Sequence, residues 1–139
     1  MKSIKGEIGI FLITLFVITS CSKVTKVYSL PIESDYYVSV NSKLIKIHNE
    51  VCVSNIRSSR LRNSLIKFTL NLDTTKILKE YRNLDIRILI EFSDKNNNKA
   101  EIGLSRSGKF IFENRVFASD DTLMKLTSMC KKYPCVKLK

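Results

Sequence analysis

The chain has 139 residues with 24 basic and 13 acidic side chains, a net charge of +11. This length is typical of one small domain. The sequence has one histidine, His48, no tryptophan and no CxxC or HxxxH spacing, so few groups that usually carry catalysis or bind a metal are present. We therefore predict no enzyme, no cofactor and no metal site.

Residues 1–20 have the pattern of an export signal. Lys2 and Lys5 precede an apolar run at residues 8–18. A helix that spans a bilayer needs about 20 apolar residues, and this run is much shorter. Its length is typical of the apolar region of a signal peptide.

The stretch Ile18-Thr19-Ser20-Cys21 ends this signal. It resembles the lipobox of bacterial lipoproteins, with isoleucine in place of the usual leucine and threonine in place of alanine. The resemblance implies cleavage before Cys21 and lipidation of Cys21 with acyl chains such as palmitate. Each buried CH₂ contributes about 0.8 kcal/mol, so two or three chains hold a protein on a membrane. An uncleaved anchor and a plain signal peptide with an incidental cysteine are the alternatives.

The resemblance also implies a location. We expect the protein in the cell envelope, anchored by lipid to a bacterial membrane. Ser22 follows the cysteine where, in enterobacterial lipoproteins, an aspartate would retain the protein at the inner membrane. In a Gram-negative cell we therefore expect the outer membrane, facing the periplasm.

The chain that remains after cleavage is still basic. Residues 1–20 carry two lysines and one glutamate, so the other 119 residues keep a net charge of +10. We expect residues 21–34 to form the lipidated cysteine and a tether, because Pro31 argues against a central strand. Residues 35–139 are expected to form one small domain.

Alternating apolar residues predict strands in the first half of this domain. Residues 36–40 and 44–48 alternate on either side of a turn, which predicts a hairpin. Residues 66–72 and 84–92 alternate more strictly, which is typical of strands with one buried face. In the second of these, one face is expected to hold Leu84, Ile86, Ile88, Ile90 and Phe92. Residues 73–83, beginning at an Asp cap, predict a short helix.

The second half of the domain predicts a meander and a helix. Polar turns at residues 94–99 and 107–108 divide residues 84–113 into three strands. A helix capped by Ser119 or Asp120 should run to about residue 132 and face the sheet with Leu123, Leu126 and Met129 or Cys130. A short edge strand at 135–138 follows. The predicted fold class is α+β, a single antiparallel sheet with one or two helices packed on one face.

Three cysteines remain besides Cys21. Export places them in an oxidising compartment, where thiols tend to pair. Cys130 and Cys135 flank a turn at Tyr133-Pro134, so we expect a disulfide between them. Pairing of Cys52 with one of the two stays open, because sequence does not decide connectivity.

No arrangement of residues predicts a catalytic site. The stretch 105–109, SRSGK, lacks the first glycine and the following helix of a phosphate loop, and we interpret it as a β-turn. His48 and Cys52 would lie about 13 Å apart on a strand, too far for a nucleophile and its base. The pair Asp120-Asp121 is explained as a helix cap, and nothing favours Glu101 with Glu113 as an acid pair.

The densest basic cluster is Arg57, Arg60 and Arg62, which we predict to contact an anionic surface or a partner protein. A solubilising face is the alternative. No nucleic acid partner is expected for an exported protein.

The leading hypothesis is a lipid-anchored, non-enzymatic binding protein, an inhibitor or immunity protein that blocks a hydrolase or toxin at the envelope. The alternative is an envelope structural or glycan-associated lipoprotein.

Overall fold

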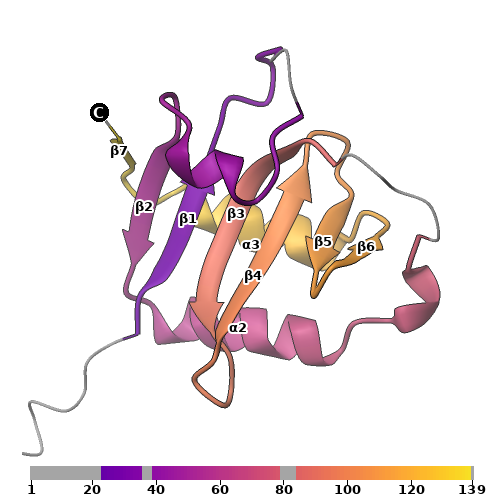
Figure 1. Cartoon of the computed structure of the whole chain (residues 1–139). Helices are drawn as coiled ribbons and strands as arrows, with labels where there is room; N and C mark the ends of the chain where they lie inside the picture. Colours follow the sequence, from indigo (N-terminus) through magenta and orange to yellow (C-terminus); the bar gives the residue numbers. More distant parts are fainter. Residues whose placement is uncertain (1–22, 36–38, 79–83, 139) are drawn as a thin grey trace, which may run out of the picture.

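The computed structural model describes residues 23–35, 39–78 and 84–138, which form a sheet covered by helices (Figure 1). Seven strands pair in the order β6-β5-β4-β3-β1-β2-β7, and every pairing is antiparallel. The strands are β1 Thr25–Ser29, β2 Cys52–Ile56, β3 Ile86–Ser93, β4 Lys99–Ser105, β5 Phe110–Phe112, β6 Arg115–Phe117 and β7 Val136–Lys137.

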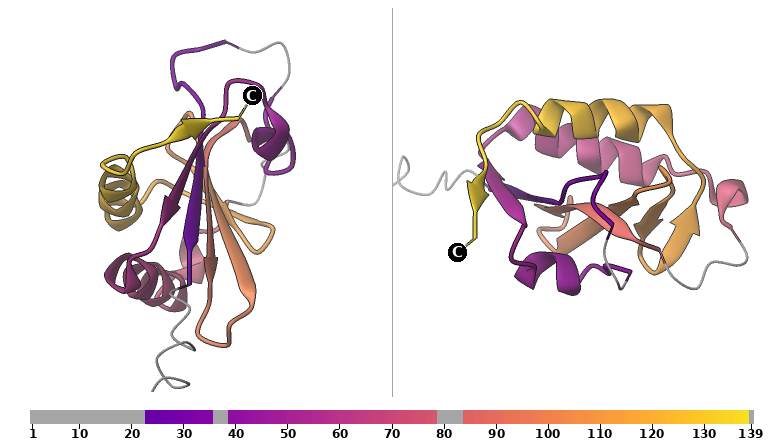
Figure 2. Two further views of the ribbon diagram at one scale, coloured as in Figure 1. Left: turned by 90° about the vertical axis from the view of Figure 1, so that its left-hand side faces the viewer. Right: turned by 90° about the horizontal axis from the view of Figure 1, so that it is seen from above.

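Two helices, α2 and α3, cover one face of this sheet, and a short 3-10 helix, η1, lies on the other (Figure 2). Their bounds are α2 Ser59–Leu70, α3 Asp121–Cys130 and η1 Leu44–Ile47. The predicted α+β class is thereby confirmed.

The two long helices pack on the sheet through residues spaced three and four apart, as an amphipathic helix requires. These buried residues are Leu61, Leu65 and Phe68 in α2 and Leu123, Leu126 and Cys130 in α3. Ser58 Oγ caps α2 by accepting from Leu61 N at 3.2 Å. Asp120 caps α3, which confirms the helix predicted there.

The predicted strand at residues 66–72 is wrong, because residues up to Leu70 belong to α2. The apolar residues there satisfy two periods at once. The helical period, which joins Leu61, Leu65 and Phe68, buries side chains on the sheet and leaves Leu70 60% exposed. Of the helix predicted at 73–83, the structure shows a 3-10 turn, η2 Thr74–Lys76, capped by Asp73. Residues 79–83 lie outside the described part.

The predicted meander is confirmed as β3, β4 and β5, but its first strand does not have one buried face. The pairing of β3 with β4 shifts between Ile86 and Ile88. A bulge of this kind moves the following side chains to the opposite face. Ile88, Ile90 and Phe92 therefore pack under the helices, whereas Leu84 and Ile86 pack on the η1 side.

The hairpin predicted at 36–48 is also wrong. Residues 44–47 form η1, whose start is held by Asn41 Oδ1, an acceptor for Lys43 N and Leu44 N. Ile45 is fully buried on the η1 side of the sheet, in an apolar cluster that includes Ile86 and Leu89, while Ile47 is 79% exposed. A four-residue alternation is compatible with such a turn. Residues 36–38 lie outside the described part.

The tether expected at residues 21–34 is wrong from Thr25 onward, because β1 is a central strand between β3 and β2. Thr25 is fully buried and pairs with Ile56. Pro31 does not interrupt this strand, since it follows Ser29 and Leu30. The sheet thus begins four positions after Cys21.

Candidate binding site between α2 and α3

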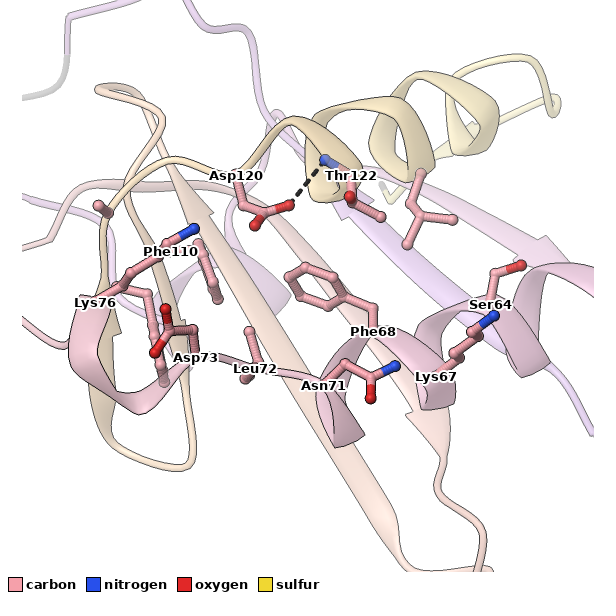
Figure 3. A pocket seen from close by; sticks show the side chains of 13 residues that line it. Ser64, Lys67, Phe68, Asn71, Leu72, Asp73, Lys76, Phe110, Asp120 and Thr122 are labelled. Atoms are coloured by element: carbon pink, nitrogen blue, oxygen red, sulfur yellow. Dashed lines mark hydrogen bonds between the residues drawn. The ribbon is translucent and has the colours of Figure 1, made fainter.

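A cavity of about 430 Å³ opens between the end of α2, the start of α3 and η2 (Figure 3). Three aromatic rings form its floor. The Phe110 ring centroid lies 5.7 Å from that of Phe68 and 5.0 Å from that of Phe117. Each of these phenylalanines is at most 8% exposed, because the rings also belong to the core beneath the helices. The floor is therefore apolar and held by packing.

The rim of this cavity is polar, with as many lysines as carboxylates among its lining residues. Lys67 and Lys76 lie on opposite sides of the opening, and Asp73 and Asp120 lie on the same side as Lys76 (Figure 3). Ser64, Asn71 and Thr122 complete the polar lining. A partner that enters would meet an apolar base surrounded by hydrogen-bonding groups.

Both carboxylates at the rim are engaged in capping. Asp120 Oδ1 accepts from Thr122 N at 2.8 Å and Leu123 N at 3.2 Å. Asp73 Oδ1 accepts from the Thr75 hydroxyl at 2.6 Å and from Thr75 N at 2.9 Å. These hydrogen bonds from Thr75 lower the pKa of Asp73 below its usual value. A general acid at neutral pH needs the opposite shift, so Asp73 is suited to binding and not to proton donation.

Sequence reasoning missed this cavity. Its floor comes from α2, β5 and β6, whereas the sequence pattern predicts a strand at residues 66–72. No local pattern signals that Phe68, Phe110 and Phe117 meet. Only the packing of α2 and α3 beside each other on the sheet brings the rim together.

The predicted basic cluster is divided by the structure. Arg57 and Arg60 are exposed at the junction of β2 and α2. Arg62 is partly buried and donates from Nε to Ser93 O at 2.9 Å and from Nη2 to Asp94 O at 2.8 Å. These hydrogen bonds hold α2 against the β3–β4 turn, so Arg62 has a structural role. Of the three arginines, Arg57 and Arg60 are the ones exposed to solvent.

A second charged cluster lies on the η1 face of the sheet. The Lys46 ammonium bridges Glu91 and Glu101, and Lys99 Nζ lies 2.9 Å from Glu91 Oε1. Tyr28 Oη donates to Glu91 Oε2 at 3.2 Å. Burial disfavours the charge on Glu91, but the two lysines outweigh it and lower the pKa of Glu91 to about 2. Each charge in this cluster has a partner of opposite sign within the domain. The cluster therefore stabilises the fold, and we do not treat it as a candidate binding site.

The predicted disulfide Cys130–Cys135 is wrong. Cys135 is bonded to Cys52 in β2, with 5.5 Å between their Cα atoms. Cys130 ends α3 one turn after Leu126 and points into the core, where burial raises the pKa of its thiol to about 11. The chain then turns and carries Cys135 to the sheet edge beside β2.

The other candidate residues do not assemble into a site. His48 follows η1 and accepts from Glu50 N through Nδ1 at 3.2 Å, and Cys52 is in the disulfide. Residues 105–109 form the turn interpreted from the sequence, with Gly108 at φ 81°. Among the described residues, no three His, Cys, Asp or Glu side chains cluster as metal ligands would. Cys21 lies outside the described residues.

No protein-family model, curated protein or solved structure matches this chain. Within the described ranges, no helix combines the length and apolar character needed to cross a bilayer. Because the comparisons match no known protein, the function of the cavity must be inferred from its own chemistry.

Proposed function

We propose that this protein is a lipid-anchored binding protein of the bacterial cell envelope, and that it captures a partner protein in the cavity between α2 and α3. Cys21 carries the lipid, and the captured partner is a hydrolase or toxin that the protein inhibits. The observation that carries this proposal is the apolar floor of Phe68, Phe110 and Phe117 within a polar rim.

The composition of the cavity supports a protein partner. Protein interfaces combine an apolar centre with a polar, hydrated rim, and the strongest contributions come from single side chains that fill a pocket. An aliphatic or aromatic side chain that covers the phenylalanine floor would gain about 1.5–3 kcal/mol from burial alone. The lysines and carboxylates at the rim would then select the neighbouring polar groups of the partner.

The position of the cavity is consistent with an anchored binding protein. It lies at the end of α2, whereas the start of β1, which follows the anchor in sequence, lies beside the start of α2 (Figure 1). A helix of 12 residues is about 18 Å long. The cavity is lined by the second half of α2, from Ser64 onward, and so lies away from the end of the helix nearest the anchor, where a partner in the aqueous space can reach it.

A pocket-filling substitution tests the proposal. Thr122 is exposed on α3 at the rim, so Thr122→Trp should occupy the cavity without disturbing the core. Lys125→Trp is the matched control, since Lys125 is exposed on the same helix and does not line the cavity. The lipidated full chain would be purified from envelopes of its own bacterium at 0.15 M and 0.5 M salt, and copurifying proteins quantified by mass spectrometry.

We expect one protein to copurify with the wild type and with Lys125→Trp at both salt concentrations, and to fall at least tenfold with Thr122→Trp. Equal recovery with all three chains would contradict a role for the cavity. The absence of any enriched protein would contradict the proposed capture altogether.

A further inference from the structure

One end of the domain is strongly basic. It consists of the start of β1, the end of β2, the start of α2 and the β3–β4 turn, which meet in space (Figure 1). Contacts fix this arrangement: Lys23 Nζ meets Asn97 Oδ1 in the turn, and Arg62 donates to Ser93 O and Asp94 O. The exposed basic residues of this end, here called the basic end, are Lys23, Arg57, Arg60 and Lys95.

Almost no negative charge opposes the basic end. The described segments 23–25, 55–63 and 93–98 contain a single carboxylate, that of Asp94. Its Oδ1 accepts from Asn96 N and Asn98 N, both at 2.8 Å, which turns it toward the backbone of its own loop. Among the described residues no carboxylate forms an ion pair with Arg57, Arg60 or Lys95, so these charges can act on an external anion.

The covalent chain places the basic end close to Cys21. Consecutive Cα atoms lie 3.8 Å apart, so the Lys23 Cα lies at most about 7.6 Å from that of Cys21. Thr25 is within about 15 Å and is fixed by its pairing with Ile56, the residue before Arg57. The limit of about 7.6 Å for Lys23 is comparable to the Debye length at physiological salt, about 8 Å, and the limit for Thr25 is about twice that length. No long tether separates the domain from its point of attachment.

We infer that the basic end faces the membrane and binds anionic phospholipid headgroups, which orients the domain with the cavity directed away from the bilayer. This inference rests on the lipid anchor at Cys21 in the proposed function and extends it to a lipid class and an orientation. Each basic side chain held near an anionic surface strengthens the attraction about fivefold. Salt screens this attraction beyond about one Debye length. The basic side chains can therefore contribute only because the short link to Cys21 keeps them close to the membrane surface.

Lysine acetylation of the lipidated full chain on vesicles tests this inference. One set of vesicles contains phosphatidylcholine alone, and the other contains phosphatidylglycerol in addition, which gives it a negative surface potential. Lys95 is the reporter, because the position of Lys23 is set by the covalent link whatever the lipid. Lys67 and Lys76, exposed at the other end of α2, are internal references.

We expect acetylation of Lys95 to slow at least threefold on anionic vesicles relative to neutral ones and to recover at 0.5 M salt, while Lys67 and Lys76 react alike on both. Arg57→Gln with Arg60→Gln should remove this protection. Lys125→Gln with Lys132→Gln, which removes the same charge elsewhere on the surface, should leave it intact.

The outcomes separate the inference from the anchor. A protein that floats with both vesicle types while Lys95 reacts equally on both would overturn the orientation but keep the lipid anchor. A protein that floats with neither would overturn the anchor and the inference together. Protection of Lys95 by purified envelope glycan in detergent, with none on vesicles, would assign the basic end to a polymer and overturn the lipid contact.

Discussion

At the scale of single residues, the three cysteines in the described part of the chain have different surroundings. Cys52 and Cys135 join β2 to the segment after α3 and close a loop with a sequence separation of 83. Cys130 lies in the core under α3 and keeps a free thiol whose pKa is raised by burial. Because a thiol reacts as its thiolate, Cys130 is protected from oxidation at neutral pH.

This pairing predicts how reductant affects stability. A disulfide that closes a loop of this length contributes about 2–5 kcal/mol to the free energy of unfolding. Urea unfolding should show a loss of that size on reduction of the wild type and of Cys130→Ala. Cys135→Ala should be destabilised already and insensitive to reductant. If Cys130→Ala were the insensitive variant, the sequence-based pairing of Cys130 with Cys135 would be right.

At the scale of the elements, the ion cluster that joins η1 to β3 and β4 predicts how stability depends on pH. The pKa of Glu91 is about 2 in the folded protein, below the ordinary value of 4.5. A depressed pKa stabilises the fold above the unfolded value, and this contribution disappears as the pH falls from about 4.5 to 2. The wild type should lose roughly 1–3 kcal/mol through Glu91 over that range.

Glu91→Gln isolates this contribution. The variant should be less stable than the wild type at pH 7, and its free energy of unfolding should change less between pH 5 and pH 2. Glu33→Gln, at an exposed position, is the control and should follow the wild type. Parallel curves for all three proteins in chemical denaturation would show that the cluster does not stabilise the fold.

The elements also show what the sequence could predict. The strands of the meander and α3 were predictable because a single period and an Asp cap agree there. Residues 66–72 satisfy both a strand and a helix period, and only packing of Phe68 on the sheet decides between them. The bulge at Arg87 leaves no local signal, so the change of face after Ile86 could not be foreseen. The cavity depends on the packing of five elements, α2, η2, β5, β6 and α3, and no local pattern signals it either.

At the scale of the whole molecule, α2 connects two surfaces of different character. Its start contributes Arg60 to the basic end, and its end contributes Lys67 and Phe68 to the cavity. If Cys21 carries the proposed lipid, this layout would hold the basic end at the membrane and present the cavity to the aqueous space. The proposed orientation and the location of the protein at the envelope therefore both depend on the anchor.

The intact mass of the mature protein tests this dependence most directly. The full chain would be extracted from membranes with detergent and measured by mass spectrometry, together with Cys21→Ala. We expect the wild type to begin at Cys21 and to carry two or three acyl chains. Cys21→Ala should carry none and should keep residues 1–20 or be cut elsewhere, and its domain should still fold. A wild-type protein with Met1 intact and Cys21 unmodified would contradict the account.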